Sequence, residues 1–315
     1  MTEGEPKKNI DLSYLFGGKQ FDIEHALNMY AKSFVLMPAF GIYEKKVIEV
    51  FKSQIETCHI YIIGTLPAVE IVDWRLDAER LFIRMLVAGK RHELDWPLSD
   101  GAELVETEDG WFVKSNDSYW APTQEEFVRR LNQEQDAIPF DVLYIGQAYG
   151  KDGSRNALDR LLKHETLQQI SVRGIPADRR LNVLMLEIEP GTRMLTFMNP
   201  WALNKEQSES RISAGLDKLF GTSDAERVTL YEASLIRYFQ PPFNKEFKES
   251  FPSTNLKLLK DCYDKDFSAL ISEICIDELP FKMTSGIVPP SQYHTAYFDL
   301  HEDDARKVFF EWKAP

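Results

Sequence analysis

The spacing of apolar residues divides the chain into short helices and strands. In the first third of the chain it predicts helices over residues 21–34, 44–57, 76–87 and 123–132. The last of these begins with a capping box formed by Thr123 and Glu126. Short apolar runs bounded by turn residues predict strands over residues 60–63, 69–72, 103–106 and 111–114. The first third therefore has an α+β pattern, and it contains no motif with a recognisable chemistry.

The middle of the chain has a clearer order of strand, helix, strand and helix. Its predicted strands cover residues 140–145 and 181–188, and its predicted helices cover residues 154–169 and 223–239. The last helix begins at a capping box that starts with Ser223, and the pair Pro241-Pro242 ends it. Residues 253–315 alternate short helical and strand-like patches, including a strand over residues 295–300.

The composition is that of a globular protein. Hydrophobic residues make up 43% of the 315 residues and charged residues 28%, which excludes a disordered, collagen-like or coiled-coil chain. The 3 cysteines form no Cys-x-x-Cys pair, so the sequence favours neither a disulfide scaffold nor a structural zinc site. No apolar leader follows Met1, and the most apolar stretch, residues 58–72, is too short to span a bilayer. We therefore expect a cytoplasmic protein with no membrane contact.

Charge is distributed unevenly along the chain. It carries 37 basic and 50 acidic residues, a net charge of -13, which argues against non-specific binding of nucleic acid over the whole surface. Residues 1–141 have 15 basic and 25 acidic residues (net -10), residues 142–248 have 15 and 13 (net +2), and residues 249–315 have 7 and 12 (net -5). Only the middle segment can meet a polyanion without strong repulsion, although the acidic segments also fit ordinary solvated surface.

Glu232 is the first candidate for chemistry. In the helix over residues 223–239, Val228, Tyr231 and Leu235 share one face by helical spacing. Glu232 lies beside this apolar stripe, where a carboxylate is costly unless it meets a metal ion, a cation or hydrogen-bond donors. On spacing alone, a boundary glutamate in a surface ion pair is the favoured explanation, because such acids are common on amphipathic helices.

Arg160, His164 and Tyr144 are the other candidates in the middle segment. Arg160 and His164 are four residues apart on the predicted helix and so share a face, where a guanidinium backed by an imidazole can grip a phosphate. Tyr144 ends a strand at a Tyr-Ile-Gly turn and can accept a proton if a cation lowers its pKa. Taken singly, each is better explained by a structural role: Arg160 and His164 as solvated residues on a helix surface, and Tyr144 as a half-buried strand residue.

Taken together, these residues have a recognisable order. Tyr144-Ile-Gly146 is followed by Arg160 and His164, then by Glu232, and then by Asn244 after the proline pair. This order over residues 138–248 resembles the GIY-YIG nuclease superfamily. The resemblance implies a small sheet flanked by helices over 138–248, with an N-terminal α+β domain over 1–137 and a C-terminal α+β extension over 249–315 packed on it.

The sequence departs from the family pattern in two places. The loop over residues 149–156 is longer than the usual turn, so Arg155 competes with Arg160 as the catalytic arginine; Arg160 is preferred because His164 follows it. No Gly-Ile-Tyr strand lies shortly before residue 140, and Tyr119 is the nearest candidate for the missing tyrosine. Gly41-Ile-Tyr43 and Tyr61-Ile-Ile-Gly64 resemble the family name in their letters, but the strand at Tyr61 leads into another strand and not into an arginine-bearing helix. The sequence therefore assigns them no role.

The resemblance implies a reaction and a cofactor. Glu232 would hold a single Mg²⁺ or Mn²⁺ ion, Arg160 would neutralise charge on the scissile phosphate, and Tyr144 or its partner tyrosine would help deprotonate the attacking water. His164 would relay a proton or contact the phosphate. Asn244 would orient Glu232 or the backbone of the site.

The sequence thus supports one leading function and two alternatives. The leading one is a metal-dependent endonuclease (a hydrolase of nucleic acid, with DNA preferred over RNA). The first alternative is a catalytically impaired module of the same fold that binds nucleic acid or protein, which the missing first tyrosine favours. The second is a protein-interaction role for the acidic segment 1–137, which suits a basic partner. The oligomeric state is open.

Overall fold

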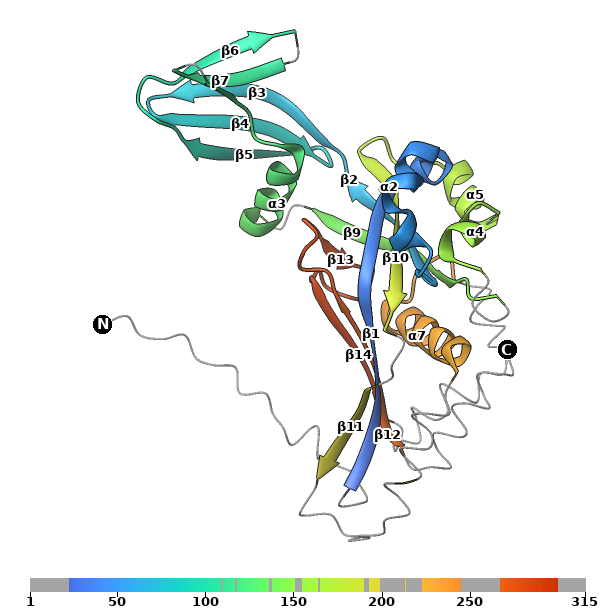
Figure 1. The fold of residues 1–315 in the computed structure, drawn as a ribbon. Coiled ribbons are helices and arrows are strands. Elements are labelled where there is room, and N and C mark those ends of the chain that lie inside the picture. The colour runs from blue at the N-terminus through green and yellow to red at the C-terminus, as the bar shows by residue number, and fades with distance from the viewer. Residues whose placement is uncertain are drawn as a thin grey trace.

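A computed structural model describes residues 23–108, 110–116, 118–135, 138–150, 155–163, 165–189, 193–198, 213, 223–244 and 267–299. Within these residues, eight strands form one sheet in the order β13-β9-β2-β10-β1-β12-β14, and β11 also pairs with β1. The strands are β1 (Ile23–Pro38), β2 (Ile60–Pro67), β9 (Pro139–Gln147), β10 (Arg179–Ile188), β11 (Arg193–Met198), β12 (Phe267–Cys275), β13 (Lys282–Thr284) and β14 (Tyr293–Asp299). This sheet runs through the centre of the molecule (Figure 1).

The centre of the sheet is the antiparallel run β9-β2-β10-β1. Nearly every residue of β2 is buried, because the sheet is covered on both faces, and such a strand is a continuous apolar run with no polar alternation. Side chains still alternate between the faces. Tyr61 and Ile63 belong to one buried cluster, and Ile60 and Ile62 to the other.

Short helices cover one face of the sheet. They are η1 (Ala39–Tyr43), α2 (Lys45–Ile55), α4 (Ala157–Leu161) and α5 (Glu165–Arg173). Ile42, Ile55, Leu161 and Leu167 from these four elements pack in the same cluster as Tyr61. This face therefore brings the Arg160-bearing segment over the strands β2 and β9.

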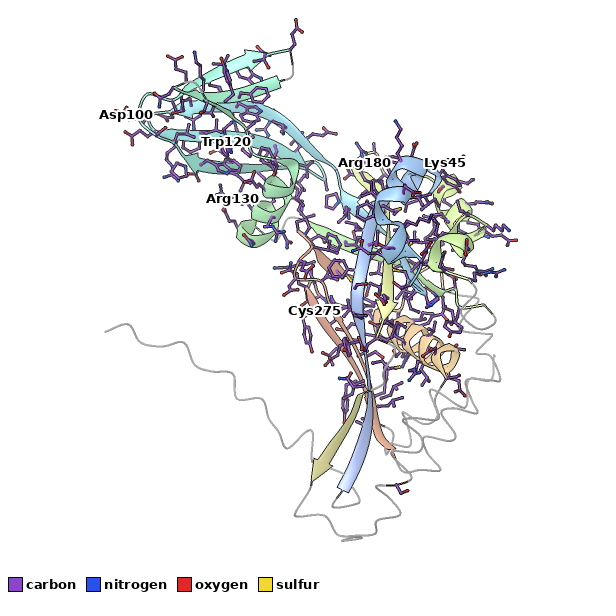
Figure 2. The ribbon with its side chains drawn as sticks, in the orientation of Figure 1. Lys45, Asp100, Trp120, Arg130, Arg180 and Cys275 are labelled. Carbon is purple, nitrogen blue, oxygen red and sulfur yellow. The ribbon has the colours of Figure 1, made fainter. Side chains whose placement is uncertain are left out.

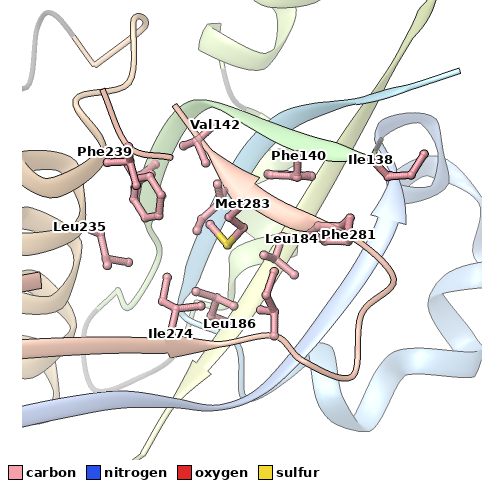
Figure 3. Close-up of a cluster of buried hydrophobic side chains, with 14 of the residues drawn as sticks. Ile138, Phe140, Val142, Leu184, Leu186, Leu235, Phe239, Ile274, Phe281 and Met283 are labelled. Carbon is pink, nitrogen blue, oxygen red and sulfur yellow. The ribbon is translucent and has the colours of Figure 1, made fainter. Parts of the chain in front are cut away.

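The other face carries α7 (Asp224–Phe239), which packs in one buried cluster with side chains of the sheet strands β12 and β13. Figure 3 shows Leu235 and Phe239 of α7 with Phe140 and Val142 of β9 and Met283 of β13 in one apolar cluster. A capping box at Ser223 begins α7, where the Ser223 side chain accepts from the Glu226 amide, as the sequence predicts. The apolar face of the helix packs against β9.

A separate unit is inserted between β2 and β9. It consists of the sheets β3-β4-β5 and β6-β7-β8 and of one helix. Its elements are β3 (Val69–Asp77), β4 (Arg80–Val87), β5 (Lys90–Pro97), β6 (Glu103–Thr107), β7 (Gly110–Ser115), β8 (Ser118–Trp120) and α3 (Gln124–Gln135). Phe127 of α3 packs edge-on against Trp96 of β5, with ring centroids 5.3 Å apart. Figure 1 shows this unit standing to one side of the main sheet.

The predicted α+β class is confirmed, together with the helices that became α2, α3 and α7 and the strands that became β2, β3, β6, β7, β9, β10 and β14. None of the helices in the described part of the chain is long and apolar enough to cross a membrane.

Three predicted helices are wrong. Residues 23–34 belong to β1, which pairs with β10, β11 and β12, so strand pairing overrides local helical spacing. Residues 80–87 form β4, whose buried residues alternate strictly, with Leu81, Ile83 and Met85 inward. The helix expected over 154–169 is two helices, because Asn156 caps the short α4 and a new helix begins at Glu165.

The structure also does not follow the predicted division at residues 137/138 and 248/249. Strands β1 and β2 from the first part, β9 and β10 from the second, and β12 to β14 from the third all belong to one sheet. The part expected to be an N-terminal domain instead supplies central strands and an insertion. Long-range strand pairing of this kind leaves little trace in a local sequence pattern.

Gly64 provides a test of the packing between β2 and β9. A Cβ atom placed on Gly64 would lie 2.4 Å from Phe140 Cε1 and 2.6 Å from the Asp141 carbonyl oxygen. We expect Gly64→Ala to destabilise the fold by about 1–3 kcal/mol, the usual cost of overpacking. A lower urea midpoint checks this. Gly286→Ala is the matched control, because a Cβ there meets nothing within 4 Å. Equal urea midpoints for the two variants would contradict the close packing of Gly64 against Phe140.

Candidate functional site

A polar pocket lies where β2, the end of β9, α4 and α7 meet. Its volume is about 410 Å³, within the usual range for small-ligand sites. Its described lining consists of Tyr61, Tyr144, Gln147, Ala148, Tyr149, Gly150, Arg155, Arg160, Ala225, Thr229 and Glu232. Tyr144, Arg160 and Glu232, which the sequence singles out, are therefore brought together from three separate elements.

Two tyrosines from adjacent strands form one wall of this pocket. Tyr61 lies opposite Gly146, and Tyr144 lies opposite Ile63, so the two tyrosines are diagonal neighbours on the same face. Their rings are stacked, with centroids 6.1 Å apart and an interplanar angle of 28°. Both phenols thus belong to one site.

Gly146 makes room for this pair. A Cβ atom on Gly146 would lie 2.5 Å from Tyr61 Oη and 2.8 Å from Tyr144 Cε1. Such contacts are far shorter than van der Waals separation, so any side chain here would push the Tyr61 ring away. The glycine of the Tyr-Ile-Gly strand end is therefore a packing requirement of the neighbouring tyrosine.

Tyr61 is 1% exposed, and its charge state follows from this burial. Desolvation raises the pKa of the Tyr61 phenol far above 10, and the nearby Tyr144 and Glu232 groups raise it further. The Arg160 guanidinium opposes the rise through its charge and a hydrogen bond. The phenol therefore keeps its proton in the free protein, while the nearby Arg160 guanidinium favours its loss.

Glu232 is buried in the middle of α7, with 1% of its surface exposed. Burial raises the pKa of its carboxyl group well above the usual value, while the main-chain and side-chain amides of Gln147 and the Arg160 guanidinium lower it. Thr229 Oγ1 donates to the Ala225 carbonyl at 2.7 Å and lies 3.3 Å from Gln147 Oε1, so the oxygen of the Gln147 side chain faces Thr229 and its amide group faces the carboxylate. Glu232 Oε2 has no hydrogen-bond partner among the described residues, so the pocket contains a buried acceptor available to a ligand.

Arg160 comes from α4 on the opposite wall. Asn156 caps this short helix: its side chain accepts from the Asp159 amide, and Asp159 in turn accepts from the Asn156 amide. The second arginine, Arg155, also lines the pocket. Arg160 is the arginine whose charge acts on both Tyr61 and Glu232, which favours it over Arg155 as the arginine nearest these two groups.

Asn244 fastens the chain after α7 to the tyrosine strand. Its Nδ2 donates to the Ile145 carbonyl at 2.8 Å, and its Oδ1 accepts from the Ile145 amide at 3.0 Å. The Phe243 amide donates to the Leu143 carbonyl at 3.1 Å. The sequence predicts that Asn244 orients either Glu232 or the backbone of the site. In the structure Asn244 bonds to the backbone of β9 at Ile145, between Tyr144 and Gly146.

This arrangement predicts a structural cost at Asn244. Asn244 is 1% exposed, so Asn244→Ala leaves two buried main-chain groups without partners, and we expect a loss of about 2–4 kcal/mol in unfolding free energy. Urea denaturation monitored by tryptophan fluorescence measures it. A loss below about 0.5 kcal/mol would mean that this pair of hydrogen bonds does not hold the strand end.

Tyr119 and Tyr43 do not line the pocket as described. His164 lies outside the described residues. Tyr119 is in β8 of the inserted unit, 57% exposed, and does not line the pocket. Tyr43, of Gly41-Ile-Tyr43, is in η1 and 61% exposed.

Tyr61 is the site residue that the sequence interpretation misses. That interpretation gives it no role because its strand leads into β3. The structure places it beside Tyr144, since the inserted unit separates two strands that are neighbours in space. The available signal was the similarity of the two apolar runs, Ile60-Tyr-Ile-Ile63 and Leu143-Tyr-Ile-Gly146, each with its tyrosine second.

The pocket offers one carboxylate among its described residues as a ligand for a metal ion. Among the described residues, no group of three or more His, Cys, Asp or Glu side chains is placed to hold a metal, which argues against a zinc-type cage of protein ligands there. Glu232 is the carboxylate in the described pocket lining, and its Oε2 is unpartnered. A hard ion that keeps most of its waters, such as Mg²⁺, fits this donor set.

Comparisons with known proteins give no independent assignment. No family model, curated protein or solved structure matches the chain. The functional conclusion therefore depends on the pocket, its stacked pair of Tyr61 and Tyr144, and its buried carboxylate.

Proposed function

We propose that the chain is a metal-dependent endonuclease that hydrolyses phosphodiester bonds of nucleic acid in the pocket lined by Tyr61, Tyr144, Arg160 and Glu232. The observation that carries this proposal is the convergence of these four groups from β2, β9, α4 and α7. The same residue types in the same order support membership of the GIY-YIG superfamily. In that interpretation, Tyr61 supplies the first tyrosine from a strand that an insertion separates from Tyr144.

Each side chain has a role that its surroundings allow. Arg160 is exposed on α4 and can pair with a phosphate oxygen while its charge acts on Tyr61. The Tyr61 and Tyr144 hydroxyls orient the attacking water. One of the two first loses its proton to solvent, because positive charge lowers its pKa, and the resulting phenolate accepts the proton of the water. Asn244 holds the Tyr144 strand through Ile145.

Glu232 is the residue that would hold the divalent ion, Mg²⁺ or Mn²⁺. A bound ion of this kind supplies positive charge that stabilises the leaving 3′ oxygen. Binding would also relieve the cost of the unpartnered Glu232 Oε2. Gln147 keeps the carboxylate oriented from the end of β9.

The alternative of a catalytically impaired module rested on the missing first tyrosine. Tyr61 stacks on Tyr144 and supplies a second phenol to the pocket, so we favour an active site. The net charge of -13 favours substrate contact limited to the segment around the pocket and strong salt dependence.

A cleavage assay tests the proposal. Purified full-length chain with Mg²⁺ or Mn²⁺ should nick supercoiled plasmid or cut labelled single-stranded DNA or RNA, and EDTA should stop the reaction. Arg160→Ala should lower the rate by at least about 100-fold, and Arg155→Ala should lower it less. Intact substrates at high enzyme concentration with either ion would refute the proposal.

A further inference from the structure

A second concavity lies at the opposite end of β2 from the pocket. It has a volume of about 960 Å³, and we call it the apolar groove. Its described lining includes Phe40 and Tyr43 of η1, Pro67 of β2, Val172 of α5, and Arg179 and Arg180 of β10. The pocket is lined by Tyr61 near the start of β2 and the groove by Pro67 at its end, which places them about 20 Å apart along the strand.

Two aromatic rings are exposed on the wall of the groove. Phe40 is 68% exposed and Tyr43 is 61% exposed, and both come from the short η1 helix. Val172 of α5 is 86% exposed on the lining as well. Large apolar side chains gathered at a concave surface indicate a binding surface, and flat exposed rings suit a planar ligand.

The charge of the groove indicates an anionic ligand. Its described lining includes Arg179 and Arg180 and no carboxylate. Arg179 pairs with Asp141, whereas Arg180 donates to the main-chain carbonyls of Ala177 and Arg179, which do not neutralise it. Figure 2 shows Arg180 and Lys45 at the same end of the molecule, and Lys45 follows Tyr43 closely in the chain.

A basic segment connects the groove to the pocket. Residues 155–180 contain 6 Lys and Arg and 3 Asp and Glu, a net charge of +3 in a chain of net charge -13. This segment includes Arg160 on the pocket wall and the α5 residues of the groove wall. A nucleic-acid strand that lay over α4 and α5 would therefore have its phosphates near basic residues from the apolar groove to the pocket.

We propose that the apolar groove binds unpaired nucleobases, and that the chain therefore acts on nucleic acid with a single-stranded part. Exposed rings that stack bases, joined to a basic track for phosphates, are the two elements of single-strand recognition. Bases stacked inside a duplex cannot reach Phe40 and Tyr43. This proposal rests on the proposed function of the pocket, because the basic segment leads from the groove to Arg160.

Binding without cleavage tests the groove separately from the pocket. Fluorescence anisotropy in EDTA measures the affinity of the full chain for labelled oligothymidylate of about 20 nucleotides and for a duplex of equal length. We expect single strand to bind more tightly than duplex, and the double variant Phe40→Ala, Tyr43→Ala to weaken single-strand binding by about tenfold or more. Arg180→Gln should reduce the slope of log affinity against log salt by about 0.7.

The controls separate the two proposals. Both rings are exposed, so the double variant should keep the wild-type melting temperature, and Tyr293→Ala, which removes a 54% exposed tyrosine from β14, should keep wild-type affinity. Unchanged binding by the double variant, or equal affinity for duplex, overturns the groove proposal even if the chain cleaves. Weakened binding in a chain that never cleaves supports the groove and refutes the nuclease. The proposal is also overturned if the wild type binds no oligonucleotide and the double variant sediments as a smaller species than the wild type. That result would mean that the groove joins two copies of the chain.

Discussion

Glu232→Gln should abolish cleavage and at the same time raise the melting temperature at neutral pH. The loss of rate should be at least about 100-fold, because the neutral amide cannot hold a divalent ion as the carboxylate does. The gain in stability follows from burial, which raises the folded-state pKa of Glu232 above its usual value of 4.5. A group of this kind stabilises the fold below pH 4.5, and this contribution is lost as the pH rises through the folded-state pKa.

The pH dependence of melting checks this sign. Wild type and Glu232→Gln should melt at similar temperatures near pH 4, and the variant should become the more stable of the two as the pH rises to 7. Added Mn²⁺ should raise the melting temperature of the wild type and leave that of the variant unchanged. Glu278→Gln, at an exposed glutamate, is the control and should show none of these effects. A variant less stable than wild type at every pH would mean that Glu232 is satisfied by a partner in the fold.

Tyr61→Phe should lower the cleavage rate by at least about 100-fold, and Tyr119→Phe should leave it unchanged. The phenyl ring keeps the packing on Tyr144, so the variant loses only the hydroxyl that lies over Gly146 and bonds to Arg160. Single-turnover cleavage at saturating enzyme measures both rates. Equal rates for Tyr61→Phe and wild type would remove Tyr61 from the reaction.

The pH profile separates a proton-transfer role of Tyr61 from a purely structural one. Burial holds the pKa of the Tyr61 phenol above 10, so the fraction that has lost its proton grows about tenfold for each pH unit below that pKa. The wild-type rate should therefore still be rising at pH 9, and Tyr61→Phe should flatten the profile. Gly146→Ala, which displaces the same ring, should lower the rate and keep the rising profile.

Sequence patterns predict a helix or strand correctly where residues close together in the chain determine it. The helix α7 follows from its capping box at Ser223 and its terminal proline pair, and the position of Glu232 on it follows from helical spacing. The strand β9 follows from its apolar run and its glycine. Tyr144, Arg160 and Glu232 could be singled out because each lies on or beside such an element.

The features that the sequence did not predict depend on contacts between distant segments. β1 was expected to begin as a helix because its apolar residues fit both periods, and its three strand partners come from residues far along the chain. Tyr61 was given no role because the whole inserted unit separates it from Tyr144. Tyr119 is the candidate for the first tyrosine only because it lies near Tyr144 in the sequence. Nearness in sequence is a poor guide where an insertion separates two paired strands.

We propose that the pocket shared by Tyr61, Arg160 and Glu232 binds a divalent cation. Crystals of the full chain soaked in Mn²⁺ and measured at a wavelength where manganese scatters anomalously test it directly. We predict one strong anomalous peak within coordination distance of Glu232 Oε2, about 2.0–2.3 Å away, on the side that faces Tyr61 and Arg160. Well-diffracting crystals with no peak beside Glu232 at saturating Mn²⁺, or with that oxygen bonded to a neighbouring side chain, would contradict the account.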